Sequence, residues 1–523
     1  MNLRAELLVA FGLLGVGLLS GTTVTFYDEA LPTTMNPLFS RSMVDVRTHE
    51  LVFDRLFYRS GITNELRSRL VEKYQTLEGG EQLKLFLKDG VKWHDDRRLV
   101  PADVCFTIDA ILNESTPSTI GKPYREAIRS CEVDDKDNAV IVSFNKLYYN
   151  PRERLGFHVL PQHVLKDTRV DPTHEFSSVP IGSGPLSADK DHREIRYEVF
   201  ENAHHSSRIT SLAQTQGADP FVQVRTLLNA GVHGVISVAP RLRPEIAASD
   251  EVGLQSYDLR SWWFIAINPN REPLGDPRVR QALDRTIDRE ALRELTVGWD
   301  PEDPDPACTF VSGPFVNASP YYNRSVQVNP TSDLAEAQRL MNEAGASQFN
   351  GRWMYNGAPI RLTVGIHAPL EVEAEDLLSQ VGNQLQLGGF DRQVFKVTND
   401  DWTRKALAGQ LSKFDILIGK WSFGLVEDVN ALFQTRSGDQ GAFNIFGYSN
   451  AEADALMTKY AGARTDTEAK DAYHDLHALL ADDLPYLFLW RLNTKSAWRN
   501  EVRNNIIAPY YYFTEYDGWT FRG

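Results

Sequence analysis

Aromatic side chains near the ends of apolar segments are the residues of this chain best suited to hold a small molecule. Trp421 and Phe423 follow one apolar segment, Trp262 opens a second, and Trp490 lies within a third. Their rings can bury a large area against a ligand, but they supply neither a nucleophile nor a base. Each ring is equally compatible with plain core packing. The four residues are therefore candidate walls of a binding cleft, with core packing as the alternative for each.

Four polar residues accompany these aromatic walls. Arg491 stands beside Trp490, and its guanidinium could pair a ligand carboxylate or form a salt bridge between lobes. Asn36 lies in the loop PTTMNPLFS, Asn268 closes the apolar run WWFIAIN, and Asn444 lies in FNIFGYSN. A ligand or hinge contact is one interpretation of these asparagines, and a turn stabilised through the side-chain amide is the other. All four residues are candidate ligand contacts.

The sequence contains no compact catalytic motif. The GxSxG, HExxH and Walker patterns are absent, and a dispersed pair of carboxylates is the remaining possibility for a hydrolase. His94-Asp95-Asp96 could hold a metal or act in acid–base chemistry, or could simply form a turn. IGSGP, residues 181–185, lacks the third glycine of a dinucleotide loop, and its two glycines instead allow a ligand or another strand to approach closely. We therefore expect no enzyme activity, no cofactor and no metal.

Two of the three cysteines are candidates for a disulfide bond. Cys105, Cys131 and Cys308 are too few and too scattered for a metal cage. Cys105 falls in a predicted helix and Cys131 opens a predicted strand of the same lobe, so an oxidising compartment could join them. Such a bond would stabilise the fold by about 3 to 4 kcal/mol. Two separate buried thiols are equally compatible with the sequence, and Cys308 would stay unpaired.

Length and charge limit the possible partners. The chain has 523 residues, with 55 Lys and Arg against 70 Asp and Glu, a net charge of −15. This length predicts two or three lobes. A nucleic-acid partner is disfavoured because phosphate binding needs a basic face. We expect a monomer whose overall acidity says little about its ligand, since a site can differ in sign from the whole protein.

The N-terminus carries an export signal. Arg4 precedes the apolar run Leu7–Leu19, which is too short to span a bilayer comfortably and is placed like the apolar part of a secretory signal. Residues 1–21 are therefore predicted to be a signal peptide or an uncleaved anchor.

Capped helices alternate with strands along the second half of the chain. Asp276 is a natural N-cap before Pro277, and Asp288 can cap a following helix. Between them an apolar stripe recurs at helical spacing, formed by Val279, Ala282, Leu283 and Ile287. Helices are then expected at Ser332–Gly345, Ala374–Leu387, Asp401–Leu407, Ala451–Tyr460 and Thr467–Ala481, and strands at Ile360–Ile366, Arg392–Val397 and Phe414–Lys420. Asp333 and Glu336 stand at capping-box spacing at the start of the first of these helices. This alternation predicts an α/β lobe. Nearer the N-terminus, Val44–Tyr58 is also expected to be helical.

Three segments resemble the family 5 solute-binding proteins of bacterial ABC importers, which include oligopeptide, dipeptide and nickel receptors. They are DPRVRQALDRTIDREAL (276–292), GVKWHDDRRLVPADVCFTIDAI (90–111) and IGSGP. The resemblance runs from about Thr25 to Arg503, in the family's order. It implies an α/β periplasmic-binding-protein fold of type II, cluster C, with two lobes that close on a ligand, an inserted lobe and two hinge crossings.

The resemblance also divides the chain into lobes. Lobe I is expected to comprise residues 22–44, 176–262 and 487–523, the inserted lobe II residues 45–175, and lobe III residues 263–486. The apolar segments Trp262–Asn268 and Tyr486–Leu492 would be the two crossings and should pair with each other. The C-terminal segment Ile506–Gly523 should pack on lobe I.

Several positions depart from the family pattern. Peptide-binding relatives place an Asp three residues after the cleft Trp, where its carboxylate holds the peptide's α-ammonium, and Gly424 stands there in this chain. Glu427 or Asp428 could substitute, or could cap a helix that begins near Val429. The family's usual Tyr-Trp is replaced around Ala203-His204-His205. At His94-Asp95-Asp96, relatives have a His-Asp-Gly turn, so Asp96 replaces the glycine.

The resemblance implies a receptor that captures a peptide or other polar solute between closing lobes and delivers it to the membrane permease of an ABC importer. Such a receptor would be periplasmic. Many relatives carry a lipid-bearing Cys after the leader, whereas this chain has Thr22 there, so no lipoprotein is expected. The alternatives are a sensory or chaperone-like protein that kept the fold, or a secreted hydrolase.

Overall fold

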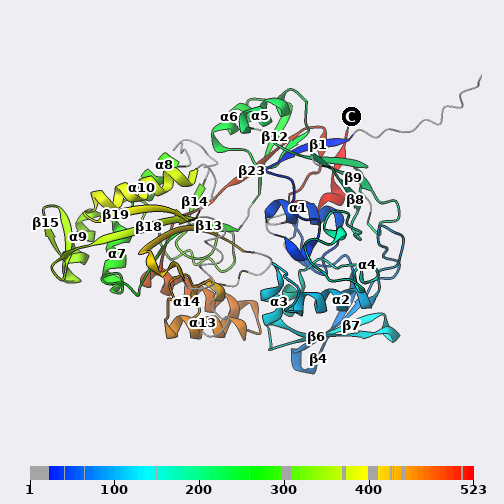
Figure 1. The fold of residues 1–523 in the computed structure, drawn as a ribbon, viewed down its shortest axis with the longest axis horizontal. Helices are drawn as coiled ribbons and strands as arrows, with labels where there is room; N and C mark the ends of the chain where they lie inside the picture. The colour runs from blue at the N-terminus through cyan, green and yellow to red at the C-terminus, as the bar shows by residue number, and fades with distance from the viewer. Residues whose placement is uncertain are drawn as a thin grey trace, which may run out of the picture.

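The computed structural model arranges three principal sheets in two bodies that lie side by side (Figure 1). It describes residues 23–522 except 41, 64, 149, 192, 206, 218, 258–259, 297–307, 368–372, 398–409, 424–426, 428, 437–442 and 508–510. The expected leader, the expected helix Asp401–Leu407, Gly424 and Asp428 therefore lie outside the described residues. One body holds a seven-stranded and a four-stranded sheet, and the other holds a five-stranded sheet.

The seven-stranded sheet gathers strands from both ends of the chain. Its order is β12-β23-β11-β1-β10-β9-β8. β1 runs parallel to β10 and β11, whereas β23 runs antiparallel to β11 and β12. The strands are β1 (Val24–Asp28), β8 (Leu186–Lys190), β9 (Glu194–Val199), β10 (Ser211–Gln216), β11 (Gly234–Val235), β12 (Val252–Tyr257) and β23 (Thr494–Arg499). The C-terminal strand β23 thus lies between strands formed much earlier in the chain. Helices α5 (Pro220–Leu228) and α6 (Arg243–Ala247) contact this sheet through β11 and β12.

A buried ion pair joins β1 to helix α1 (Met43–Val52). Asp28 accepts two hydrogen bonds from the Arg47 guanidinium, at 3.1 and 2.5 Å, and one from the Gln214 amide at 2.9 Å. The side chain of Arg47 is 2% exposed and that of Asp28 is 0% exposed. Burial opposes the charge of Arg47, but the neighbouring Asp28 carboxylate raises its pKa. Each charge therefore depends on the other for compensation.

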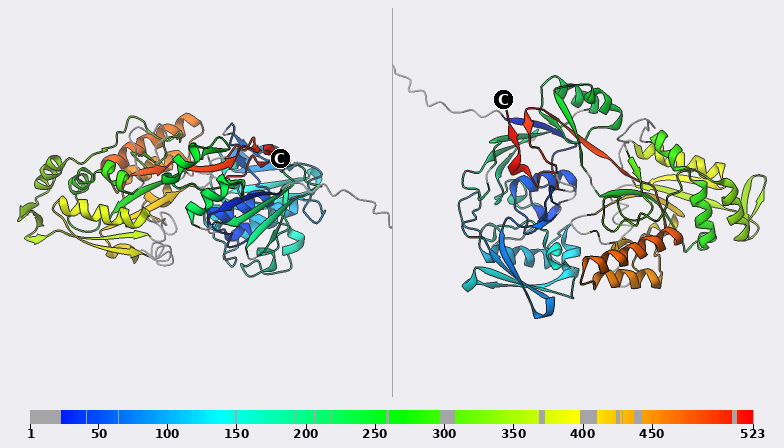
Figure 2. Two further views of the ribbon diagram at one scale, coloured as in Figure 1. Left: turned by 90° about the horizontal axis from the view of Figure 1, so that it is seen from above. Right: turned by 180° about the vertical axis from the view of Figure 1, so that it is seen from behind.

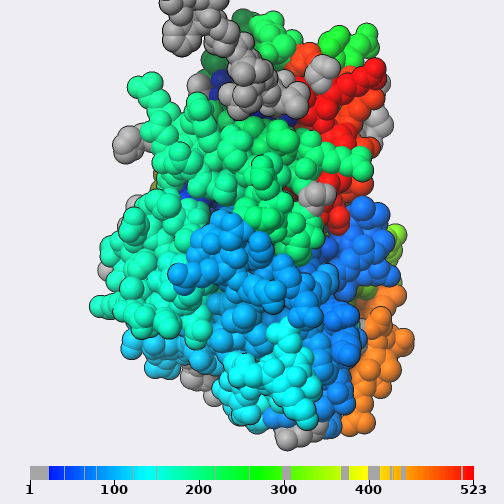
Figure 3. All heavy atoms as spheres, turned by 90° about the vertical axis from the view of Figure 1, so that its right-hand side faces the viewer, coloured from blue at the N-terminus to red at the C-terminus, as the bar shows by residue number. Residues whose placement is uncertain are grey.

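The four-stranded sheet is an insertion after α1 that shares one continuous apolar core with the seven-stranded sheet. Its order is β4-β5-β7-β6, with all neighbours antiparallel. The elements of the insertion are β4 (Val71–Leu77), β5 (Gln82–Leu87), α2 (Pro101–Leu112), α3 (Gly121–Ala127), β6 (Ile128–Asp134), β7 (Ala139–Phe144) and α4 (Gln162–Leu165). A disulfide joins Cys105 on α2 to Cys131 on β6, whereas Cys308 is a buried free thiol. Figure 3 shows the insertion, in blue to cyan, forming the lower part of this body.

The five-stranded sheet has apolar layers on both faces. Its order is β19-β18-β20-β13-β21. Alternate residues of β13 enter two different cores, with Trp263 and Ile265 on one face and Trp262 and Phe264 on the other. This explains why WWFIAI is apolar throughout. The strands are β13 (Ser261–Ile267), β18 (Arg361–His367), β19 (Asp391–Val397), β20 (Ile416–Ser422) and β21 (Tyr486–Phe488), and the helices of this body are α7 (Pro277–Thr286), α8 (Arg289–Thr296), α9 (Leu334–Glu343), α10 (Glu373–Leu387), α12 (Asn430–Phe433), α13 (Ala451–Ala461) and α14 (Asp466–Asp483).

The remaining strands form small sheets. They are β2 (Tyr58–Arg59) with β3 (Leu66–Arg67), β14 (Cys308–Phe310) with β22 (Trp490–Leu492), β15 (Ser347–Phe349) with β16 (Arg352–Tyr355) and β17 (Ala358–Pro359), and β24 (Val502–Arg503) with β25 (Thr520–Phe521). Within the described part of the chain, no helix combines the length and apolar character that crossing a membrane requires.

The two distant apolar segments pair with each other, as the sequence predicted. β13 runs antiparallel to β21, with Phe264 opposite Phe488. Both strands belong to the five-stranded sheet. The chain enters this body just before β13 and leaves it for the other body after β22. The C-terminal segment, red in Figures 1 and 2, lies on the body that holds α1. There Trp519 packs against Trp498 with ring centroids 5.0 Å apart.

The predicted helix caps of the third lobe are confirmed. The Asp276 carboxylate accepts a hydrogen bond from the Arg278 backbone N–H at the start of α7. Asp288 accepts one from the Ala291 N–H in α8, and Asp333 one from the Glu336 N–H in α9.

The expected helix Val44–Tyr58 was too long, because α1 ends at Val52. The loop IGSGP packs against this end: a Cβ on Gly182 would lie 1.8 Å from the Val52 carbonyl oxygen, and the Gly184 N–H donates to that oxygen. His94 joins the same contact, since its backbone N–H donates to Gly182. The close approach predicted for these glycines is therefore made by the end of a helix.

Candidate functional site

The two bodies meet at a group of aromatic side chains. Phe315, Tyr321, Trp421, Phe423 and Phe443 belong to one apolar core of the third lobe, and we call these five residues the interlobe aromatic cluster. The same core is contacted from the other body by Val46 on α1, Leu66 on β3 and the buried Tyr511. The apolar core that holds the cluster therefore reaches the boundary between the two bodies.

Trp421 is the half-buried member at the end of β20. Its ring lies 5.4 Å from that of Phe443 and 6.4 Å from that of Phe423. The indole N–H is buried but makes no hydrogen bond within the part of the chain that the structure describes. Buried donors normally have an acceptor, so this N–H is suited to a ligand oxygen. Phe423 extends the wall, since its ring stacks on Phe315 at 6.3 Å.

The other two predicted aromatic walls lie elsewhere. Trp262 is directly opposite Trp421 in the β13–β20 pairing, but it is 0% exposed and packs against Phe264 and Phe488. Trp490 lies in the core that covers the other face of the sheet. The structure thus brings Trp421 and Phe423 together in one core, with Trp262 beside Trp421 on the neighbouring strand and Trp490 in a different core.

The predicted polar contacts have structural partners. The Asn36 side chain accepts from the Leu38 N–H and caps a short helix. Asn268 donates to the Phe414 carbonyl at 3.0 Å, and Asn444 donates to the Tyr448 carbonyl at 2.7 Å. Arg491 lies on β22 opposite Thr309. The three asparagines therefore stabilise turns and strand ends.

An ion pair that sequence reasoning missed lies next to the aromatic cluster. Arg260 contacts the Glu427 carboxylate at 2.7 Å, and Ser319 donates to the same carboxylate. Glu427 is buried and caps no helix, because α12 begins at Asn430 without a side-chain cap. The one available signal was the position of Arg260 directly before the apolar strand β13.

A small pocket extends the junction toward the inserted lobe. It is lined from both bodies, by Tyr148, Asn150, Glu153, Arg154, Tyr460 and Ala461. Tyr460 lies on α13 and connects the pocket to the aromatic cluster, with its ring 5.5 Å from that of Tyr321. Polar groups from one lobe and aromatic groups from the other therefore face each other here.

A buried histidine pair sits behind the junction on the first body. His49 on α1 and His158 have ring centroids 5.9 Å apart, and His158 Nε2 lies 3.3 Å from Glu50. Burial lowers the pKa of His49 to about 3 and that of His158 to about 4, and the neighbouring Arg55 acts in the same direction. Burial opposes ionisation of Glu50, but Arg55 and His158 bring its pKa down to about 2. The Arg55 guanidinium also lies 3.9 Å over the Tyr511 ring.

Acid should destabilise the protein through this histidine pair. Because the folded pKa of His158 is about 4, the unfolded chain binds more protons below the ordinary histidine pKa of 6.5. The unfolding free energy should therefore fall as pH drops from 6.5 to 4, by about 3 kcal/mol for a shift of this size. Urea unfolding measured across this range should show a shallower pH dependence for His158→Gln than for the unmodified protein. His174→Gln is the control, and an equal slope in all three proteins would contradict the assignment.

Comparisons with known proteins identify the family and the fold of this chain. Residues 65–443 match the family described as bacterial extracellular solute-binding proteins, family 5. The oligopeptide-binding protein AppA of Bacillus subtilis (strain 168) is 25% identical over 502 residues, covering 89% of this chain and 85% of that protein.

Solved structures share the whole fold. The structure of Bacillus subtilis AppA in complex with a nonapeptide has a TM-score of 0.79 and 21% identity, covering 96% of this chain and 99% of that one. NikZ from Campylobacter jejuni in complex with Ni(L-His) also has a TM-score of 0.79, with 20% identity, covering 95% of this chain and 99% of that one. The fold is thus that of a bilobal periplasmic binding protein. Since the family match spans most of the described chain, this protein belongs to the bacterial extracellular solute-binding proteins of family 5.

Proposed function

We propose that this receptor captures a peptide or other polar solute at the interlobe aromatic cluster and delivers it to the membrane permease of an ABC importer. The observation that carries the ligand site is the half-buried Trp421, whose indole N–H has no acceptor among the described residues. A solute carbonyl or carboxylate would accept this hydrogen bond while its apolar part lies against Phe423 and Phe443. Closure of the lobes would then exclude water from the contact.

The proposed function requires no catalytic chemistry. A receptor needs a surface that closes and reopens, and its charged groups serve as anchors rather than as acids or bases. We infer that the protein acts as an exported monomer without a cofactor. Because the family's lipid-bearing Cys is replaced by Thr22, we further infer that no lipid is attached.

Substitution of Trp421 tests the site directly. Mass spectrometry of natively purified protein would identify a bound solute, and calorimetry would then measure its affinity. Trp421→Ala should weaken binding at least about tenfold, because it removes both the ring surface and the N–H. Trp421→Phe keeps an aromatic ring but loses the N–H, so its solute affinity should lie between that of the unmodified protein and that of Trp421→Ala. Trp353→Phe, in the far core, is the control, and unchanged affinity in Trp421→Ala would show that Trp421 is only a packing residue.

Peptides, if bound, should not be recognised mainly through a free α-amine. The family's ammonium-binding Asp is replaced by Gly424, and Glu427, a potential substitute, is already paired with Arg260. A peptide and its N-acetyl form should therefore differ in Kd by less than about tenfold, or 1.4 kcal/mol. Calorimetry with both forms checks this. A larger loss on acetylation would mean that another carboxylate holds the ammonium.

A further inference from the structure

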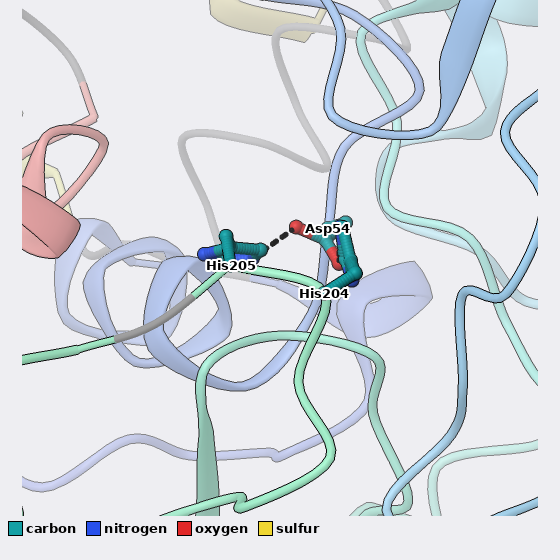
Figure 4. Close-up of side chains that lie close together, drawn as sticks. All are labelled: Asp54, His204 and His205. Atoms are coloured by element: carbon teal, nitrogen blue, oxygen red, sulfur yellow. Dashed lines mark hydrogen bonds and ion pairs between the residues drawn. The ribbon is translucent and has the colours of Figure 1, made fainter.

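A second cluster of chemically able side chains lies outside the interlobe aromatic cluster. Asp54, which follows α1, meets His204 and His205 from the loop between β9 and β10 (Figure 4). His205 Nε2 lies 3.0 Å from one oxygen of Asp54, and His204 Nε2 lies 3.5 Å from the other. One ligand atom from each residue fits within a mutual separation of 4.8 Å. Ligand atoms around a tetrahedral zinc ion are roughly 3.3 Å apart for bonds of about 2.0 Å, so only small movements are needed.

The residues around this cluster hold the candidate ligands in place. His205 Nδ1 lies 3.0 Å from Asp517 and Nε2 lies 3.0 Å from Asp54, so each ring nitrogen faces a carboxylate. A metal ion that displaced the Nε2 proton would bind at that nitrogen while the Nδ1–H still donates to Asp517. Metal-binding histidines commonly carry such a carboxylate behind them. The Ser183 hydroxyl donates to Asp54 at 2.9 Å, and Ser183 is fixed between the two glycines that contact α1. Arg69 pairs with Asp517 at 3.0 Å and so helps to hold this carboxylate beside His205.

His204 contributes a single long contact to this ion-pair network, from Nε2 to Asp54 at 3.5 Å. Both of its ring nitrogens are buried and neither makes a hydrogen bond. The ring centroids of His204 and His205 are 4.5 Å apart and the angle between the ring planes is 81°, so the two rings contact each other edge to face. Buried polar atoms without partners are uncommon and call for a ligand or another explanation. A metal ion at Nε2 would satisfy this ring.

We propose that Asp54, His204 and His205 bind a divalent transition-metal ion such as Zn²⁺. Two imidazoles and one carboxylate favour zinc, nickel, cobalt or copper over magnesium or calcium, which prefer oxygen ligands. The His204 and His205 side chains are 13% and 12% exposed, so a water molecule can complete the coordination. The ion would join α1, the β9–β10 loop and, through Asp517, the C-terminal segment. Its role is structural and independent of the solute at the lobe junction.

The metal can be tested on the tag-free full-length protein after removal of bound ions with a chelator. Titration with ZnCl₂ by calorimetry should show one site with micromolar or tighter affinity, and Co²⁺ should give the visible absorption of a four-coordinate ion. His204→Gln should weaken Zn²⁺ binding at least about tenfold, and because His204 makes no hydrogen bond, this variant should still fold. Zn²⁺ should also raise the Tm of the unmodified protein but not that of His204→Gln.

Two controls separate this site from others. His163→Gln removes an imidazole that also contacts a carboxylate, Asp95 at 2.8 Å, and it should leave Zn²⁺ affinity unchanged. Trp421→Ala should lose solute affinity and keep the metal, so failure of one proposal does not affect the other. Absence of Zn²⁺ binding in the unmodified protein, or full affinity in His204→Gln, would overturn the metal site.

Discussion

Replacing Gly182 by alanine should lower the unfolding free energy by at least about 3 kcal/mol. The added Cβ would lie 1.8 Å from the Val52 carbonyl oxygen and 2.7 Å from its carbonyl carbon, which are rigid backbone atoms at the end of α1. The loop can only accept the methyl group by moving away from α1, which breaks the hydrogen bond from the Gly184 N–H to Val52. The thermal unfolding midpoint, measured by circular dichroism, should fall clearly.

Gly253→Ala is the matched control for this steric argument. Gly253 lies on β12, and the nearest atom to an added Cβ is the Asn500 side-chain oxygen at 3.7 Å. This substitution should change the unfolding free energy by no more than about 0.5 kcal/mol. Equal midpoints for the two variants would show that the loop can relax and that the approach to Val52 imposes no cost.

Replacing Asp28 by asparagine should destabilise the first lobe by about 3 to 5 kcal/mol. The change preserves the shape of the side chain but leaves the Arg47 guanidinium, which is 2% exposed, without its carboxylate partner. Glu29 lies 3.5 Å from Arg47 but is 54% exposed, so solvent screening weakens its compensation. Urea unfolding followed by tryptophan fluorescence measures the loss.

A double variant distinguishes loss of the charge from loss of packing. Arg47→Met combined with Asp28→Asn removes both charges and keeps an unbranched side chain in the same space. It should be more stable than Asp28→Asn alone, because no uncompensated charge remains buried. A double variant as unstable as Asp28→Asn would mean that lost hydrogen bonds, and not the isolated guanidinium, cause the effect.

Features that depend on nearby residues could be predicted from the sequence. The caps at Asp276, Asp288 and Asp333 act on backbone N–H groups two or three residues away, so residue type and spacing suffice to place them. The run WWFIAI likewise indicates a strand covered on both faces. The family match extends this local success to the whole fold.

The site was predictable only in part, because its contacts join residues far apart in the chain. The sequence offered Trp421 and Phe423 as walls, and the structure brings the two rings into one apolar core. It did not reveal that Glu427 pairs with Arg260, more than 160 residues earlier in the chain. Nor did the pair His204-His205 indicate Asp54, because no spacing rule links two loops that only the fold brings together.

The central position of β23 determines when the first lobe can finish folding. A chain grows from its N-terminus at about 5 to 20 residues per second, so on the order of tens of seconds separate the synthesis of β12 from that of β23. During this interval β12 lacks its partner and β11 presents an unpaired edge, since β23 lies between them. The nascent lobe therefore stays open until almost the whole chain has been made.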